Sequence, residues 1–592
     1  MSFKYESQLE RLQEHRTIKH FSILERLLER FSTGERVVLY ALSIVLAGSA
    51  LALALGVSNA ASVVMPARSG TLTEGVIGPT RFINPLIALS QSDHDLTELV
   101  YSGLTRTLPD GSIVPDLASS YDVSADGTTY TFHLRPDATF QDGTPILAAD
   151  VVFTVQKAKD PDIKSTERAD WDGVTVAAPN AHTVVFTLPH AYAPFLENTS
   201  LGILPKHLWE NVSTEEFPFS PLNTHPIGSG PYRVVSVTND STGAAVRYDL
   251  APFNHFTLGE PYLQKITFLF YSNEDALIAA YNAGRVGSIA GISPAGVETL
   301  KPRGSLVRVA LPRTFGIFFN QSKNPVLADS AVRAALDAAI DKQAIVGSVL
   351  DGFGTVLDSP IPPGILDDTA PTTPQSIPVS IASTTPSGDT ATAKARAILS
   401  AGGWTFDNAA GAWKKKKSLL QLSLSTADEP ELAATANAVA AEWRAAGVNV
   451  DVHVYPLSEL NSSVIRPRQY DAVLFGEVVG RTADLFAFWH SSQRNDPGLN
   501  VALYANSKTD ALLTQARATN DQNTRKKLYT QFASIIAKDQ PAVFLYAPEF
   551  LYAVPTRLEG LQLGALTSPS ERFATVYQWY TDTEHVWGVF AN

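Results

Sequence analysis

The sequence predicts a mixed α/β protein made of several domain-sized units and preceded by a single membrane-spanning helix. The chain has 592 residues and is 45% hydrophobic, so it can bury sizeable cores and corresponds to roughly three or four domains. Beyond about residue 70, short strand patterns alternate with helical ones, which is typical of α/β or mixed α+β lobes. A long uncharged stretch near the N-terminus predicts the membrane helix.

The membrane helix is expected at Val37–Val57, a stretch of 21 uncharged residues. With a rise of about 1.5 Å per residue, such a helix crosses a hydrocarbon core of about 30 Å. Seven Lys and Arg residues precede it, and almost none follow before Arg68. The positive-inside rule therefore places residues 1–36 in the cytoplasm and everything from about Asn59 outside. A signal peptide cleaved near Ser58–Ala60 is the alternative, but both the apolar stretch and the segment before it are longer than in signal peptides.

The segments on either side of this helix have different expected roles. Apolar residues recur at helical spacing in the cytoplasmic part, which predicts an amphipathic helix that lies on the inner leaflet or pairs with another helix. These residues are Phe21, Leu24, Leu27, Leu28 and Phe31. Residues 58–69 are expected to be a linker between the anchor and the folded part of the chain.

Charge and cysteine content exclude several classes of function. The net charge is −13 and the only tight basic run is Lys414–Lys417, which argues against nucleic-acid binding. That run lies between Trp413 and an alternating apolar segment, so we interpret it as a solvated turn. The chain has no cysteine, which excludes disulfides, thiolate chemistry, thiolate metal sites and a lipidated N-terminal Cys.

A polar-rich stretch, "TYTFHLRPDATFQDGTPILAADVVFT" (Thr129–Thr154), could be taken for a catalytic loop. Its first six residues, Thr129–Leu134, alternate between apolar and polar, however, which predicts a strand with one buried face and His133 on the other. The Pro- and Gly-containing segments that follow are typical of turns. Asp150 falls in the first turn of the next helix, where a carboxylate suits the helix dipole. We therefore interpret the stretch as scaffold.

Two further helices and one long loop are predicted in the second half of the chain. Helical periodicity appears in Asp329–Leu350 and in Glu431–Gly447, and both segments end near glycine. Residues Pro362–Ala391 are rich in Pro, Thr and Ser and have no apolar period, which predicts a loop.

The order of several short motifs carries a family resemblance. In Leu99–Pro161 the motifs Y-x-G-L, P-D-L-A, D-G-x-x-Y-T-F-x-L-R, F-x-D-G-T-P and A-x-D-V follow one another. The likeness continues through "HPIGSGPYRVV", "LGEPYLQKITFLF", "FGIFFN", "AVRAALDAAIDKQAIV" and "ATAKARAILSAGGW". This segment resembles the extracellular solute-binding proteins of ABC importers, in the peptide- and nickel-binding family, and the resemblance covers roughly Gly70–Gly560.

The resemblance implies a two-lobed clamp that closes over a ligand, with an extra domain on the first lobe. Transferred to this chain, the first lobe comprises residues 70–104, 226–311 and 546–592. The extra domain comprises residues 105–225, and the second lobe comprises residues 312–545. Thr129–Thr154 then belongs to the extra domain, away from the ligand.

The resemblance also implies two strand-like ligand-binding segments, one early in the first lobe and one in the second lobe. In peptide binders of this family such segments hold the ligand mostly through main-chain hydrogen bonds, as an added β-strand would be held. By position along the matching motifs, they fall on Leu89, Ser90 and Gln91 in the first lobe and on Glu477, Val478 and Val479 in the second.

The sequence departs from the family pattern just after the second segment. Peptide binders usually carry an Asp there that pairs with the free amino terminus of the ligand. In this chain Arg481 occupies that place, with Asp484 three residues later. Because a cation cannot pair with an ammonium group, either Asp484 takes the role or the ligand is not an ordinary free-amine peptide. Arg481 as a solvated loop residue is a further interpretation.

The function implied by the resemblance is capture of a peptide or related small solute and its delivery to the permease and ATPase subunits of an ABC importer. The expected protein is a monomer with no cofactor, no metal site and no catalytic residues. The motifs G-x-S-x-G, H-E-x-x-H, G-x-G-x-x-G and the Walker loop are missing from the sequence, and His490 is expected to be a packed core residue. Two alternatives stay open: a sensor that signals through a partner, and a membrane-anchored hydrolase.

Overall fold

The computed structural model describes residues 31–362, 375–376, 388–479, 484–519, 521–564 and 566–587. By its internal contacts the chain forms two compact units. One, which we call the anchor unit, comprises the chain up to Ala67 and from Thr583 onward; the other, the body, comprises Arg68–Asp582.

The anchor unit contains one long helix and a two-stranded ribbon. Helix α3 spans Thr33–Ala61 and begins at a capping box, in which the Ser32 amide donates to Glu35 (2.8 Å) and the Glu35 amide donates to the Ser32 hydroxyl (3.4 Å). Among the described residues α3 is the one helix long and apolar enough to cross a membrane, and none of its apolar window is buried. Strand β1 (Ser62–Pro66) pairs antiparallel with β24 (Thr583–Trp587).

This ribbon corrects the expected linker at residues 58–69. Helix α3 continues to Ala61 and β1 follows it directly. The local sequence gives no sign of the strand, because its partner β24 lies more than 500 residues later in the chain.

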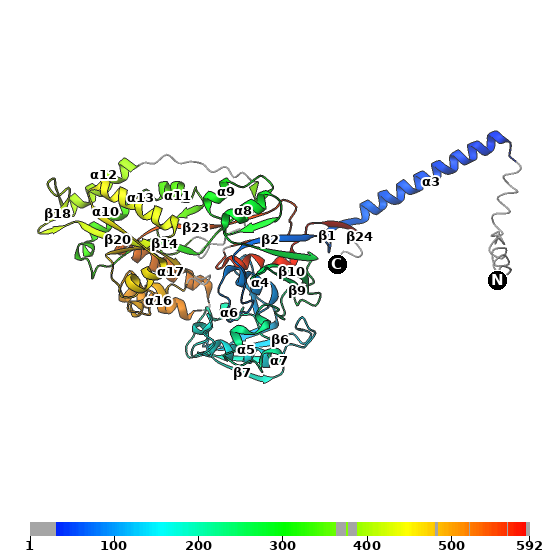
Figure 1. The fold of residues 1–592 in the computed structure, drawn as a ribbon, viewed down its shortest axis with the longest axis horizontal. Coiled ribbons are helices and arrows are strands. Elements are labelled where there is room, and N and C mark those ends of the chain that lie inside the picture. Colours follow the sequence, from blue (N-terminus) through cyan, green and yellow to red (C-terminus); the bar gives the residue numbers. More distant parts are fainter. Residues whose placement is uncertain are drawn as a thin grey trace. The chain divides into compact units, whose positions relative to one another are not determined.

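The body is organised around a sheet of 13 strands (Figure 1). Its longest strand, β23 (Ala542–Pro555), pairs with strands from both parts of the sheet. On one side of β23 the order is β12 (Ser288–Ala290), β2 (Thr71–Ile77), β11 (Lys265–Tyr271), β10 (Ala245–Pro252) and β9 (Tyr232–Asn239). On the other side it is β14 (Arg313–Phe319), β22 (Ala472–Val478), β20 (Gln421–Ala427) and β21 (Asn449–Tyr455). Strands β13 (Gly304–Ala310), β15 (Gly354–Val356) and β16 (Gln375–Ser376) pair off this path.

Both parts of the sheet contain parallel pairs joined by helical crossovers. Strand β2 is parallel to β11 and β12, and β20 is parallel to β21 and β22. Helix α8 (Glu274–Asn282) connects β11 to β12, and α13 (Pro430–Ala446) connects β20 to β21. This alternation of strand and helix confirms the predicted mixed α/β class.

The predicted helices are partly correct. Helix α13 confirms the helix expected at Glu431–Gly447, and Gly447 ends it in the left-handed conformation at φ 94°. The single helix expected at Asp329–Leu350 is wrong: the segment forms α10 (Ser330–Ala338) and α11 (Lys342–Val349). Asp341 starts the second helix because its carboxylate accepts from the Ala344 amide at 3.0 Å.

The polar-rich stretch contains the predicted strand and the start of the predicted helix. Strand β6 (Thr129–Leu134) buries Tyr130, Phe132 and Leu134 on one face. It belongs to a four-stranded sheet with β5 (Ala118–Val123), β8 (Thr183–Thr187) and β7 (Thr175–Asn180). Asp150, in the first turn of α5 (Ala148–Lys159), accepts from the Leu147 amide at 2.8 Å.

The lysine run forms a hairpin. Lys414 and Lys415 end β18 (Ala412–Lys415), Lys416 turns the chain at φ 57°, and β19 (Ser418–Leu419) follows. Lys415 pairs with Asp329 at 2.7 Å. Most of the expected loop Pro362–Ala391 lies outside the described residues, and α12 (Gly388–Ala401) covers its last residues.

Two large hydrophobic cores support the body. One packs around Trp171, Trp209 and Trp579 and includes the four-stranded sheet. The other packs around Trp443 and Trp489 and holds β14, β20 and β22 against their helices.

Candidate functional site

The end of strand β22 has one open edge. Along its whole length β22 pairs with β14, from Ala472 opposite Phe319 to Val478 opposite Arg313. On its other edge the pairing with β20 covers only Ala472 and Val473. No strand among the described residues pairs with this edge beyond Val473. An extended chain could therefore be added there.

The register shows which main-chain groups face the open edge. The Val479 amide donates to the Pro312 carbonyl at 2.9 Å, so residues 479, 477 and 475 direct their main-chain groups toward β14. The alternating residues 474, 476 and 478 face the other way. Consistent with this, the Leu474 carbonyl accepts from the Thr426 hydroxyl at 3.1 Å. The N–H and C=O groups of Gly476 and Val478 thus point to the open edge, and the Val478 side chain is 51% exposed.

Glu477 points away from the open edge and into the core. Its side chain is 3% exposed, and one carboxyl oxygen accepts from the Trp489 indole N–H at 3.2 Å. The other oxygen, Oε1, is buried without a hydrogen-bond partner among the described residues. Burial raises the pKa of Glu477 well above its ordinary value, against the smaller effect of the Trp489 hydrogen bond. Val479 beside it is fully buried.

Asp484 is engaged by a cation. Its Oδ2 accepts from the Arg517 guanidinium at 2.7 Å, and the two side chains are 18% and 35% exposed. Arg517 is the penultimate residue of α16 (Ser507–Ala518). Arg481, the other charged candidate, lies outside the described residues.

Arg517 also contacts the segment that precedes α6 (Phe195–Asn198). Its guanidinium carbon lies 5.1 Å from the centre of the Tyr192 ring and 4.4 Å from that of Phe486. Its carbonyl, at the end of α16, accepts from the Ala193 amide at 3.0 Å. These contacts join the predicted extra domain to the predicted second lobe.

The other predicted segment was expected to be strand-like, but it lies at the start of helix α4 (Gln91–Val100), where Asp93 accepts from the Leu89 amide at 3.3 Å. Ser90 caps the helix: its hydroxyl accepts from the Asp93 amide at 3.1 Å, and its own amide donates to Asp93 at 3.0 Å. Leu89 just before it is 69% exposed. Gln91 is exposed too, and its amide donates to Asp95 at 2.7 Å.

A buried charge network fixes this end of α4. Arg572 is 1% exposed and donates two hydrogen bonds to Asp95, at 2.8 and 2.6 Å, and one to Glu74 at 3.0 Å. Glu74 also accepts from the hydroxyls of Ser288 and Tyr552. Because Gln91 is bonded to Asp95, the network holds the first predicted segment against β2.

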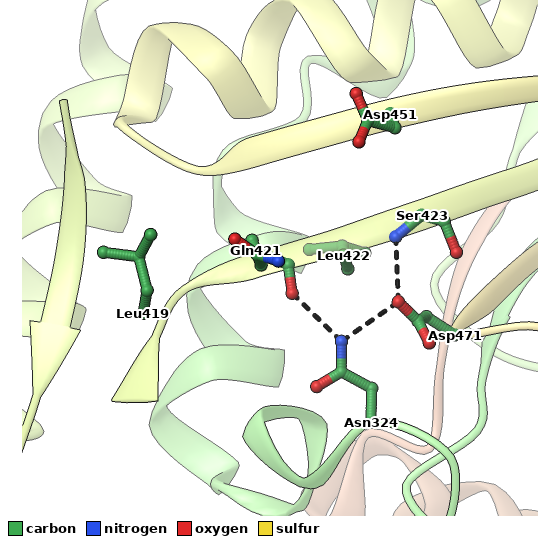
Figure 2. Close-up of a pocket in the computed structure, with 7 residues that line it drawn as sticks. All are labelled: Asn324, Leu419, Gln421, Leu422, Ser423, Asp451 and Asp471. Atoms are coloured by element: carbon green, nitrogen blue, oxygen red, sulfur yellow. Dashed lines mark hydrogen bonds between the residues drawn. The ribbon is translucent and has the colours of Figure 1, made fainter. Parts of the chain in front are cut away.

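A polar pocket of about 430 Å³ lies elsewhere on the same sheet, at the amino ends of β20 and β22 (Figure 2). There Asp471 accepts from the Ser423 amide at 3.0 Å and from the Asn324 side chain at 3.1 Å. Asn324 also donates to the Gln421 carbonyl at 3.0 Å. These groups satisfy one another and tie the strand ends together, so we assign the pocket a structural role.

Several residues at these sites were missed by sequence reasoning. They are Tyr192, Arg517, Glu74 and Arg572. No local motif marks them, since Arg517 and Asp484 are 33 residues apart and Arg572 and Glu74 are 498 apart. His490 was expected to be a packed core residue. Its ring stacks on that of Phe486, with 4.0 Å between the ring centres, and its side chain is partly buried.

Comparison with known proteins identifies the family. Residues 112–499 match the description "Bacterial extracellular solute-binding proteins, family 5 Middle". The oligopeptide-binding protein AppA of Bacillus subtilis is 28% identical over 502 residues, which cover 84% of this chain and 89% of that protein. Protein XP55 of Streptomyces lividans is 29% identical over 496 residues, which cover 82% of this chain and 85% of that protein.

Comparison with solved structures identifies the same family. The structure of AppA from Bacillus subtilis in complex with a nonapeptide matches with a TM-score of 0.64 and 26% identity, covering 88% of this chain and 100% of that one. NikZ from Campylobacter jejuni in complex with Ni(L-His) matches with the same TM-score and identity. The match covers 87% of this chain and 100% of that one. The fold of the body is thus that of the solute-binding proteins, and the resemblance in the sequence is confirmed. The chain belongs to the family 5 bacterial extracellular solute-binding proteins.

Proposed function

We propose that this protein is a membrane-anchored binding protein that captures an extended peptide between two lobes and delivers it to an ABC importer. The observation that carries the proposal is the open edge of β22, where the main-chain groups of Gly476 and Val478 face away from β14. An added strand would hydrogen-bond to these groups whatever its side chains. One relative supports a peptide ligand: AppA is an oligopeptide-binding protein, and its solved complex contains a nonapeptide.

The proposed lobes follow the boundaries expected from the sequence. Residues 70–104, 226–311 and 546–592 form the first lobe, residues 105–225 the extra domain, and residues 312–545 the second lobe. The chain crosses between the proposed lobes twice, near Leu311–Thr314, between β13 and β14, and near Tyr546–Val554, within β23. Ligand contacts come from Leu89, Ser90 and Gln91 on one side and, at the predicted second segment, from the main chain of Gly476 and Val478 at the open edge on the other. Closure on the ligand is favoured because contacts to both segments form only in the closed state.

The charge at the second segment suggests a preference among peptides. Arg517 already neutralises Asp484 at 2.7 Å, so a ligand ammonium group would have to compete with a guanidinium for that carboxylate. If Arg481 faces the cleft, the preferred ligand carries an anionic group or a blocked amino terminus near it. Replacing Arg481 by Asp is then expected to weaken the native ligand by roughly 2 to 5 kcal/mol and to improve binding of free-amine peptides. Equal affinities for acetylated and free versions of one peptide, in both proteins, would place Arg481 at the surface.

The anchor and the role in transport complete the proposal. Helix α3 is retained as a single membrane span, with residues 1–36 in the cytoplasm and the body outside. The protein acts as a monomer with permease and ATPase subunits, and no catalytic step is assigned to it. Protein that fractionates with membranes and resists salt extraction would support the anchor; a mature N-terminus at Ala61 would contradict it.

The proposed ligand class is tested by releasing what the purified protein carries. Protein isolated without denaturant is unfolded, and the released small molecules are identified by mass spectrometry. Peptides near one equivalent, which bind again to the refolded or fresh protein, are the expected result. Recovery of a metal chelate or a sugar that binds in place of peptides would contradict the proposal.

A further inference from the structure

The ribbon of β1 and β24 has an unusual composition for a surface structure. Three of its apolar side chains are at least half exposed: Val63 (51%), Val64 (55%) and Trp587 (50%). It contains no Lys or Arg. A two-stranded ribbon by itself is only marginally stable in water, so apolar side chains exposed on it indicate a further contact.

The register brings the exposed tryptophan to the end of the membrane helix. Ser62, the residue after α3, is directly opposite Trp587, and the Ser62 hydroxyl lies 3.3 Å from His585 Nδ1. Trp587 and Val64 are on the same face of the ribbon, since Val64 is opposite His585 and alternate residues share a face. An aromatic and an aliphatic side chain therefore flank the point where the chain leaves α3.

The length of the helix gives the depth of this point. If Val37–Val57 spans the hydrocarbon core, the remaining helical residues 58–61 add about 6 Å. The headgroup layer on each side of a bilayer is about 5 to 8 Å thick. Ser62, and Trp587 opposite it, would then lie at the level of the lipid headgroups, where tryptophan is enriched because its ring is apolar and its N–H is polar.

We propose that the end of this ribbon, carrying Val63, Val64 and Trp587, is a lipid-binding surface seated in the headgroup layer of the outer leaflet. The occupant is the phospholipid interface itself, because the ribbon continues directly from the membrane helix. The inference rests on the retained anchor of the proposed function. It makes the C-terminal strand a second attachment to the membrane, so that both ends of the body, Arg68 and Asp582, lead into the same lipid-bound ribbon. Without Lys or Arg in the ribbon, the contact needs no anionic lipid.

The missing cysteines make the test direct. Single cysteines are introduced into the full-length chain at Val63 and Val64, reconstituted in phosphatidylcholine vesicles and spin-labelled. Collision with an aqueous nickel reagent and with oxygen reports the depth of each label. Ser43→Cys, within the proposed span Val37–Val57 of α3, is the control for the membrane interior. Asp122→Cys, whose native side chain is 80% exposed on the body, is the control for water.

The labels at 63 and 64 are expected to be about threefold less accessible to the nickel reagent than the label at 122, and shallower than the label at 43. Trp587→Ser in the Val64→Cys protein is expected to raise this accessibility about twofold. Labels at 63 and 64 as accessible as that at 122, with the label at 43 still deep, would overturn the ribbon proposal and leave the anchor intact. An aqueous label at 43 would overturn the anchor itself, and the ribbon proposal with it.

Lipid charge and protein density in the vesicles distinguish an apolar lipid contact from an ionic contact or a contact between proteins. Adding anionic phosphatidylglycerol is expected to change nothing, and protection that appears only in its presence would contradict a contact made by apolar side chains. Tenfold dilution of the protein in lipid is also expected to leave the accessibilities unchanged. Loss of protection on dilution would mean that a second copy of the chain covers the ribbon, which would overturn a lipid contact.

Discussion

Replacing Arg517 by Met tests whether the cluster around Asp484 stabilises the body. The change removes an ion pair of 2.7 Å and two ring contacts, at 4.4 Å to Phe486 and 5.1 Å to Tyr192. A hydrogen bond between charged groups contributes about 1.5 to 3 kcal/mol, and the lower end applies because Arg517 is 35% exposed. Each cation–π contact adds about 0.5 to 1 kcal/mol. The expected loss in the free energy of unfolding is therefore about 2.5 to 3.5 kcal/mol.

A double-mutant cycle separates the ion pair from the ring contacts. Asp484→Asn removes the negative charge and keeps the shape, so in its presence Arg517→Met is expected to cost about 1 to 2 kcal/mol less. The four proteins are unfolded in urea and followed by tryptophan fluorescence, and their free energies are compared where the denaturant slope is unchanged. A coupling energy below about 0.3 kcal/mol would refute the reasoning, because it would mean that the ion pair does not form in solution.

Two other substitutions test the buried groups. Glu477→Gln keeps the acceptor for the Trp489 indole N–H and removes the titrating acid. Burial raises the pKa of Glu477 in the folded protein above its ordinary value of about 4.5 in the unfolded chain. The free energy of unfolding of the wild type therefore falls as the pH rises from about 4.5 toward that raised pKa. The variant is expected to lose less stability between pH 5 and pH 8, and equal losses in urea unfolding would contradict a raised pKa of Glu477. Arg572→Met leaves Asp95 and Glu74 as buried, unpaired carboxylates and is expected to cost about 3 to 5 kcal/mol, with Arg572→Lys less harmful. A cost below about 1 kcal/mol would show that the network is not closed in solution.

Local sequence patterns predicted the elements that depend on their own residues. Alternation placed the strand at Thr129–Leu134, and helical periodicity placed the helix that became α13. Periodicity failed at Asp341, where a side-chain cap interrupts an otherwise continuous pattern and starts a second helix. It also failed at β1, since a strand of five residues exists only through its pairing with β24.

The candidate site could be predicted only in part. The motif order pointed to the 477–479 segment as a candidate, but the open edge of β22 depends on where β20 stops pairing, which no motif encodes. In the same way, the sequence offered Asp484 as a free carboxylate, whereas α16 brings Arg517 to it. Long-range pairs of this kind, and the Arg572 network, arise from the packing of distant segments.

Hydrogen exchange at the end of β22 tests the central claim most directly. The amides of Gly476 and Val478 point to the open edge, while those of Glu477 and Val479 point to β14. With a peptide bound as an added strand, exchange at 476 and 478 is expected to slow by at least about tenfold, corresponding to about 1.4 kcal/mol per amide, with less change at 477 and 479. Unchanged exchange at 476 and 478 under saturating peptide would contradict strand addition at this edge.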